Sequence, residues 1–226
     1  MRRDVDRAVI LAAGLGTRLK WLTQTRPKAL MQVNGEAVIA HVIRSLVRQG
    51  VSDIAVNAHH HAGALTAYLG DGSQFGCSIR ISHEPSLLDS GGGVKQALNY
   101  LPGDGLVAVY NADVLTDLNL QPLCRLVPAG GAALGLVNNP KHHPTGDFAL
   151  SGTRVANSGD ECFTFSGVSV WDEKVFDDYE QGAVFSLAHP MRELADQGLC
   201  HGLLHKGAWF DIGRPTDLMR ANRFYR

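Results

Sequence analysis

The sequence predicts an α/β protein with a Rossmann-like, mixed and mostly parallel central sheet that is flanked by helices. Short apolar runs typical of strands alternate along the chain with runs of helical period. The apolar runs are nearly continuous, as expected when helices cover both faces of a sheet. Apolar residues make up 45% of the 226-residue chain and charged residues 19%, which is an ordinary globular balance. We expect a single domain over residues 1–226.

The first half of the chain supplies most of the expected strands. They cover residues 8–13, 53–57, 106–113 and 132–138. Between the first two, apolar residues recur at helical spacing from Val38 to Val47, and Gly50 supplies a C-terminal stop. The order strand, helix, strand is typical of parallel pairing.

The pattern becomes less regular after Asn139. We expect strands over residues 148–151 and 163–171 and a helix over residues 187–195. This half is interpreted as a small sugar-binding lobe built on the same sheet.

Charge and composition exclude several classes of protein. A net charge of −1 provides no field that would recruit nucleic acid or an anionic membrane. The four cysteines are widely spaced, which is typical of reduced thiols and of neither zinc sites nor redox motifs. No signal peptide or run of about 18 apolar residues occurs. We therefore expect a soluble, cytoplasmic protein, with no obligate protein partner evident.

A glycine-rich loop follows the first strand. Gly14 and Gly16 would let backbone N–H groups approach phosphate oxygens, and Arg18 and Lys28 would add positive charge on either side. The nucleotide-binding candidates here are Ala13, Gly14, Gly16, Thr17, Arg18 and Lys28. A tight turn that needs glycine for its dihedral angles is the alternative for the loop, and a solvated turn is the alternative for Lys28.

Two other phosphate-binding motifs do not fit this loop. A dinucleotide fingerprint would need a small residue at Leu19, and a Walker A loop would end in Gly-Lys-Ser/Thr. A Rossmann oxidoreductase and a P-loop protein therefore become distant alternatives.

Two aspartates far apart in the sequence end apolar runs. Asp113 closes the run from Leu106, and Asp211 closes a short run before Pro215 begins a helix. Ligands bind at the carboxyl ends of strands in open α/β sheets, and two such carboxylates could share one Mg²⁺. A turn or a helix cap is the alternative for each aspartate taken alone.

Further candidates lie in two other regions. Ser90 and Gly91 open a glycine run that we expect just before a helix, where flat backbone could contact a nucleobase; a helix N-cap at Ser90 is the alternative. The sugar-binding candidates from the second half are Gly146, Asp147, Thr164, Ser166 and Gly167.

The segment LAAGLGTRLKWLTQTRPKAL, residues 11–30, resembles the signature of sugar-1-phosphate nucleotidyltransferases. The likeness continues through the glycines at 91–93, the N-x-D motif at 111–113 and WFDIG at 209–213. Trp21 and Ala112 replace the usual proline and glycine, and neither change removes a ligand. Within the family, GDGSQFG (70–76), NNPKHHPTGDF (138–148) and FTFSGVSV (163–170) resemble the N-acetylmuramate-1-phosphate uridylyltransferases of bacterial cell-wall recycling.

The resemblance implies an Mg²⁺-dependent enzyme that takes a nucleoside triphosphate, with UTP favoured, and a sugar 1-phosphate. It implies that Gly16, Thr17, Arg18 and Lys28 hold the triphosphate, that Asp113 and Asp211 hold the metal, and that Asn111 and Asp147 face the sugar. Arg18, Lys28, Asp113 and Asp211 would then be the catalytic set. Mannose- or heptose-1-phosphate guanylyltransferase and a silent sugar-nucleotide sensor are the other readings, and the presence of both aspartates and Lys28 argues against the sensor.

Overall fold

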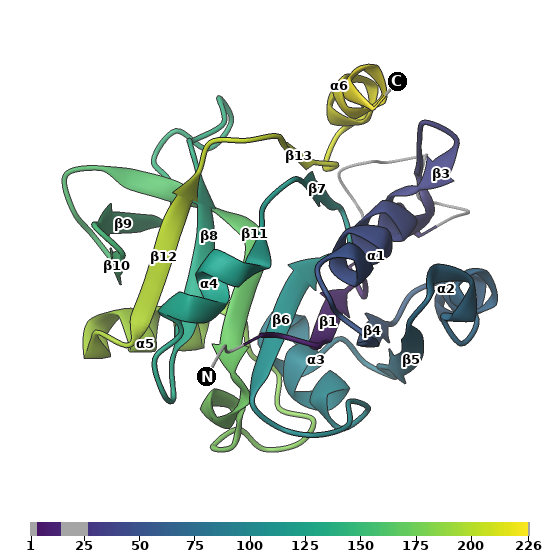
Figure 1. Ribbon diagram of the computed structural model, residues 1–226, viewed down its shortest axis with the longest axis horizontal. Helices are drawn as coiled ribbons and strands as arrows, with labels where there is room; N and C mark the ends of the chain where they lie inside the picture. The colour runs from purple at the N-terminus through teal and green to yellow at the C-terminus, as the bar shows by residue number, and fades with distance from the viewer. Residues whose placement is uncertain (1–3, 15–26, 226) are drawn as a thin grey trace.

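The computed structural model describes residues 4–14 and 27–225, and within them one large sheet runs through the molecule (Figure 1). It has nine strands in the order β5-β4-β1-β6-β11-β8-β12-β10-β9. Its members are β1 (Arg7–Leu11), β4 (Asp53–Ala58), β5 (Ser78–His83), β6 (Leu106–Asn111), β8 (Ala132–Val137), β9 (Phe148–Ser151), β10 (Arg154–Ala156), β11 (Cys162–Asp172) and β12 (Cys200–His205). Both halves of the chain therefore build the same sheet.

The sheet is mixed. Strands β5, β4, β1 and β6 are parallel neighbours, and β12 is parallel to β8. Strand β11 runs antiparallel to both β6 and β8 and so joins the parallel part to the second half. Two small antiparallel pairs lie outside this sheet: β2 (Gln32–Val33) with β3 (Glu36–Ala37), and β7 (Val114–Thr116) with β13 (Trp209–Asp211).

Helices cover both faces of the sheet, which explains its nearly continuous apolar strands. Neighbouring residues of β1 face different cores: Ala8 and Ile10 pack into one apolar cluster and Val9 into the other. The first cluster includes residues of α1 (Val38–Arg48), α2 (Ala62–Leu69), α4 (Leu120–Leu126) and α6 (Pro215–Phe224). The second includes residues of α3 (Asp89–Leu98) and α5 (Ala188–Gln197). The described residues also form three short 3-10 helices: η2 (Lys28–Leu30), η3 (Ser73–Phe75) and η4 (Glu173–Phe176).

The predicted fold class is confirmed, and the expected strands occur with small shifts of their ends. One shift matters for function, because β6 ends at Asn111 and Asp113 therefore lies in the short connection to β7. In the described part of the chain, no helix is both long and apolar enough to span a bilayer.

The expected position of the glycine run was wrong. Gly91, Gly92 and Gly93 lie inside α3, whose first residue is Asp89. A Cβ on Gly91 would lie 2.3 Å from the Phe185 ring, and one on Gly92 would lie 2.1 Å from the Ala183 carbonyl oxygen. The glycines are needed because another segment of the chain crosses this helix at close range.

Candidate active site

Three neighbouring parallel strands end at the same level and supply the floor of the site. Leu11 at the end of β1 pairs in register with Asn57 of β4 on one side and Asn111 of β6 on the other. Polar side chains thus follow buried apolar strands at one edge of the sheet, which is where open α/β sheets bind ligands.

A buried amide and carboxylate brace the start of the glycine-rich loop. Asn57 Oδ1 accepts hydrogen bonds from the N–H groups of Ala12 (2.6 Å) and Ala13 (3.2 Å), and its Nδ2 donates to Glu84 Oε1 (2.7 Å). The second carboxylate oxygen of Glu84 accepts from the N–H of Leu88 at 3.1 Å. Because Asn57 and Glu84 are 2% and 1% exposed, these bonds fix the chain where it leaves β1.

Lys28 brings the two predicted aspartates together. Its ammonium contacts Asp113 Oδ2 and lies 3.9 Å from Asp211 Oδ1. The side chains of Lys28, Asp113 and Asp211 are 14%, 21% and 26% exposed, so they form a partly buried cluster that solvent and ligands can reach. Two carboxylates that share one ammonium could also share a divalent cation, because Mg²⁺ in phosphate-transfer sites uses one or two carboxylates and completes its coordination with water and phosphate oxygens.

The pairing of β7 with β13 places these aspartates side by side. Asp211 pairs in register with Val114, and the N–H of Ile212 donates to the carbonyl oxygen of Asp113 at 2.9 Å. The two carboxylates therefore come from segments far apart in the sequence and meet where β7 pairs with β13.

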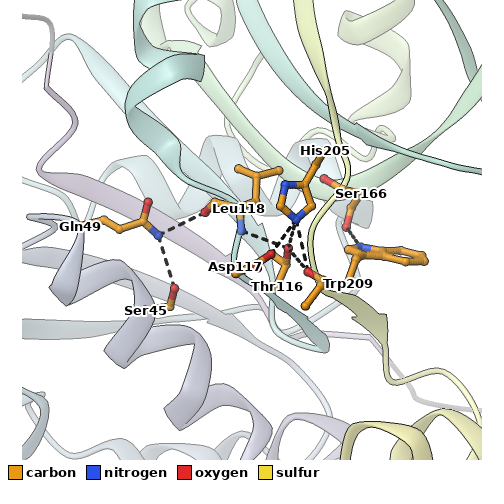
Figure 2. A network of polar contacts seen from close by, with 9 residues as sticks. Ser45, Gln49, Thr116, Asp117, Leu118, Ser166, His205 and Trp209 are labelled. Carbon is orange, nitrogen blue, oxygen red and sulfur yellow. Dashed lines mark hydrogen bonds and ion pairs between the residues drawn. The ribbon is translucent and has the colours of Figure 1, made fainter. Parts of the chain in front are cut away.

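A polar network holds the segment that leads into β13 (Figure 2). His205 Nε2 lies 2.8 Å from Asp117 Oδ1 and 3.3 Å from the Thr116 hydroxyl, which donates to the carbonyl oxygen of Ala208 at 2.7 Å. Trp209 Nε1 donates to the carbonyl oxygen of Ser166 at 2.8 Å. These bonds tie β13 to β7 and to β11, so they help to fix the position of Asp211.

Two adjoining cavities open at this edge of the sheet. The first has a volume of about 510 Å³ and is lined by Leu11, Ala13, Gly14, Asn57, Glu84, Leu87, Asp89, Ser90, Asn111, Asp113 and Val184. The second has a volume of about 250 Å³ and is lined by Leu11, Ser90, Asn111, Asp147, Phe148, Phe165, Ser186, Leu187, Ala188, Met191 and Arg192. Leu11, Ser90 and Asn111 line both cavities, so two ligands bound side by side would meet there.

Thiol chemistry has no part in this site. All four cysteines are free. Burial raises the pKa of Cys124 to about 11 and that of Cys200 to about 12, so both thiols keep their protons at neutral pH. No cysteine lines either of the two cavities.

The comparisons with known proteins agree with this geometry. Residues 7–148 match the family described as nucleotidyl transferase. The chain belongs to this family. An N-acetylmuramate alpha-1-phosphate uridylyltransferase of Neisseria meningitidis serogroup B is 38% identical over 95% of this chain and 96% of its own length. A protein of the same name from Caulobacter vibrioides is 32% identical over 95% and 94%.

Solved structures share the fold of this nucleotidyltransferase. HddC from Yersinia pseudotuberculosis, complexed with GMP-PN, has a TM-score of 0.81 at 21% identity and covers 98% of this chain and 100% of its own. The inositol-1-phosphate CTP transferase from T. maritima has a TM-score of 0.78 at 18% identity and covers 99% and 98%. At these identities the likeness establishes the fold alone.

The predicted nucleotide-binding residues divide into three groups. Gly16, Thr17 and Arg18 lie outside the described residues, so their roles stay predictions. Ala13, Gly14 and Ser90 line the first cavity, at whose edge Asp113 holds Lys28. Gly91 does not line it: its N–H donates to the carbonyl oxygen of Phe185 at 2.9 Å, which leaves no free donor there for a nucleobase.

The predicted sugar-binding residues also differ in position. Asn111 and Asp147 line the second cavity, whereas Gly146, Thr164, Ser166 and Gly167 line neither cavity. Thr164 donates to Asn139 Oδ1 at 2.8 Å, and Ser166 is fully buried beside the polar network. A Cβ on Gly167, whose φ is +85°, would lie 2.8 Å from Asn111 Nδ2. The structure thus places Gly167 against Asn111 of the cavity wall, whereas Thr164 bonds to Asn139 and Ser166 is buried.

The sequence reasoning missed Asn57, Glu84 and Arg192. Asn57 ends the apolar run from Asp53, as Asn111 ends the run from Leu106, so the rule used for Asp113 could have found it. Glu84 follows β5, whose sequence SIRISH is not an apolar run, so the rule does not single it out. Arg192 carries no such signal, because it lies in the middle of a helical pattern.

Proposed function

We propose that this nucleotidyltransferase transfers the uridylyl group of UTP to the anomeric phosphate of N-acetylmuramate 1-phosphate with the help of Mg²⁺ and releases pyrophosphate. The cytoplasm and bacterial cell-wall recycling would be its setting. Two full-length relatives at 38% and 32% identity carry that activity in their names, which supports this substrate pair. Mannose-1-phosphate guanylyltransferases also match, at 27% identity, but this chain covers only 63–64% of their length.

The observation that carries the proposal is the position of Lys28 between Asp113 and Asp211. Asp113 also lines the larger cavity, so the charged cluster stands at the place where a triphosphate would enter it. The paired carboxylates fit Mg²⁺ by the nature of their donor atoms, since hard oxygen ligands suit this ion. When bound there, the ion would neutralise charge on the phosphate oxygens.

The reaction would need no general base. A phosphate monoester has its second pKa at about 6, so the attacking oxygen of the sugar phosphate is already largely ionised near neutral pH. It would attack the α-phosphorus of UTP in line with the departing pyrophosphate. The residues of the site have to align the two phosphates and neutralise them.

Repulsion between the two anionic substrates is the main obstacle. At ~4 Å and an effective dielectric of ~20, one pair of unit charges repels by about 4 kcal/mol, which would slow the reaction by roughly a factor of a thousand. Lys28 supplies one compensating charge, and Arg18 would supply a second. Asn111 lines both cavities and would orient the sugar phosphate where they join.

The direct test is a panel of four nucleoside triphosphates against N-acetylmuramate, N-acetylglucosamine, glucose and mannose 1-phosphates, with pyrophosphate release as the readout. We expect the highest kcat/KM for UTP with N-acetylmuramate 1-phosphate. A higher kcat/KM for GTP with mannose 1-phosphate would mean that the protein is a mannose-1-phosphate guanylyltransferase and that the proposed substrates are wrong. Tight product binding without turnover would make the protein a sensor.

The metal assignment has its own test. Asp113→Asn and Asp211→Asn should each lower kcat by at least about 100-fold at saturating Mg²⁺, because each removes charge that organises the transition state. Both variants should stay folded by circular dichroism. Asp178→Asn, at an exposed position outside the site, is the matched control and should keep wild-type activity. Near-normal turnover of either site variant would contradict the assignment of Asp113 and Asp211 as metal ligands.

A further inference from the structure

We infer that Arg192 binds the lactyl carboxylate of the acceptor and thereby selects N-acetylmuramate 1-phosphate over neutral sugar phosphates. The inference rests on the proposed function, because that acceptor carries a carboxylate at the far side of its ring from the anomeric phosphate. A carboxylate that loses its hydration in a binding cavity needs a cationic partner or several N–H donors.

Arg192 is the cation in the right cavity. Among the described residues that line the second cavity, it is the only one with a positive charge. It extends from α5, whose residues Ala188 and Met191, together with Leu187 just before the helix, line the same wall. Phe148 and Phe165 add apolar surface, so a carboxylate entering here would lose part of its hydration and would gain from a charged partner.

The guanidinium is held in place without being neutralised. Its Cζ lies over the Phe148 ring, 5.1 Å from the ring centroid, and this cation–π contact does not use the N–H donors of the guanidinium. The structure records no acidic partner for the Arg192 guanidinium among the residues it describes. Arg192 Nη1 donates a weak hydrogen bond to Asn157 Oδ1 at 3.5 Å.

Asp147 is the one carboxylate among the described residues that line the second cavity, and it already has other partners. Asp147 Oδ1 lies 3.0 Å from His143 Nε2, and its Oδ2 accepts the N–H of Phe165 at 2.8 Å. Asp147 is therefore placed to contact sugar hydroxyl groups, while Arg192 keeps its donors for an anion.

The geometry of the two cavities sets the direction of the acceptor. Its phosphate must lie near Asp113 and Lys28, at the side where the first cavity adjoins the second through Asn111. The sugar then extends into the second cavity, toward α5. Arg192 would meet a group remote from the reacting phosphate, so it should affect binding of the acceptor and leave the chemical step largely unchanged.

The experiment compares Arg192→Gln with the wild-type enzyme on two acceptors that differ only in the lactyl ether. N-acetylmuramate 1-phosphate is the test acceptor. N-acetylglucosamine 1-phosphate serves as the comparison, measured as a substrate or by its Ki as a competitive inhibitor. We expect the KM for the first to rise about 10- to 100-fold, the range of a lost hydrogen bond to a charged group, while kcat, the KM for UTP and the Ki for the second stay within a factor of two.

Two further variants separate charge recognition from a structural effect. Arg192→Lys keeps the charge but loses the planar fork, so its KM should lie between those of the wild type and Arg192→Gln. Arg44→Gln is the control, because Arg44 Cζ also lies over a phenylalanine ring, 5.4 Å from the Phe75 centroid. This variant should change neither the KM for N-acetylmuramate 1-phosphate nor the Ki for N-acetylglucosamine 1-phosphate.

Three outcomes would overturn the inference. An unchanged KM for N-acetylmuramate 1-phosphate would mean that Arg192 does not touch the acceptor. An equal loss for both acceptors would mean that it acts on the shared phosphate or on the fold. If the wild-type enzyme prefers a neutral sugar phosphate, the proposed function is wrong and the inference fails with it. The panel of nucleotides and sugar phosphates would show this without any variant.

Discussion

Replacing Lys28 by glutamine should destabilise the protein when divalent cations are chelated. The Lys28 ammonium contacts Asp113 and lies 3.9 Å from Asp211 Oδ1. With an ordinary contact of about 2.8 Å on the first side, the two carboxylate oxygens lie at most about 7 Å apart. Unit charges at that separation and an effective dielectric of about 20 repel each other by about 2 kcal/mol. The glutamine variant loses the Lys28 charge that offsets this repulsion.

Thermal unfolding would measure this effect. For a domain of this size, 1 kcal/mol shifts the Tm by about 2–4 °C, so the Tm of Lys28→Gln in EDTA should be about 4–8 °C below that of the wild type. Mg²⁺ should raise the Tm of the variant more than that of the wild type, because Lys28 no longer competes for the two carboxylates. Lys174→Gln, at an exposed position outside the site, is the matched control and should show neither shift.

A double variant tests the cause. Lys28→Gln combined with Asp211→Asn removes one of the two repelling charges, so its Tm in EDTA should recover most of the loss. The electrostatic reasoning fails if the double variant is less stable than Lys28→Gln alone, or if Mg²⁺ shifts the wild type and the single variant equally.

Two other predictions concern the supporting structure. Gly93→Ala would place a Cβ 2.4 Å from the buried Nδ2 of Asn57, and overpacking of this kind costs about 1–3 kcal/mol, to be measured as a lower Tm. Gly63→Ala, in a helix with open space around it, should not lower the Tm. The raised pKa values of Cys124 and Cys200 mean that the folded protein keeps protons which the unfolded chain loses above about pH 8.5. Stability to urea should therefore fall as pH rises from about 8.5 toward 11, and replacing both cysteines by alanine should flatten that decline.

Much of the fold could be predicted from local patterns. Strands β1, β4 and β8 are nearly continuous apolar runs, and α1 carries a clear helical period followed by Gly50. The strands and α1 depend on short stretches of sequence. The proximity of Asp113 to Asp211 was predicted from the rule that strand ends gather at one edge of the sheet, but it arises from the pairing of β7 with β13 outside that sheet.

The glycine run in α3 could not be placed in the same way. Its glycines are required by the close approach of residues 183–185, a contact between distant segments that helix propensity does not encode. Propensity favoured starting the helix after the glycines, and tertiary packing overrode it. The Asn57–Glu84 pair was missed for a related reason, because its two members become neighbours only through the pairing of β4 with β5.

The position of Ser166 follows from the alternation of β11, although the strand contains an irregularity. The register between β11 and β8 shifts between Phe165 and Ser169, and Gly167 within that stretch has a φ of +85°. Val168 and Val170 still pack into the first apolar cluster, and Phe163, Phe165 and Trp171 pack into the second, so the faces alternate on both sides of the shift. Ser166 therefore faces away from Phe165, which lines the second cavity. The sequence reasoning grouped Ser166 with the sugar contacts without deciding which face of the strand meets the cavity.

The division of the sheet explains why the site can hold two different ligands. At the ends of the parallel strands β4 and β6, the polar side chains of Asn57 and Asn111 flank Leu11 of β1 around the larger cavity. The antiparallel addition of β11, and of β9 beside it, brings Phe165, Asp147 and Phe148 to the smaller one, and α5 brings Arg192. The carboxylates of Asp113 and Asp211 meet where β7 pairs with β13, one contributed just after β6 and the other after β12. A change in the second half of the sheet can thus alter acceptor choice while the charged cluster around Lys28 stays the same.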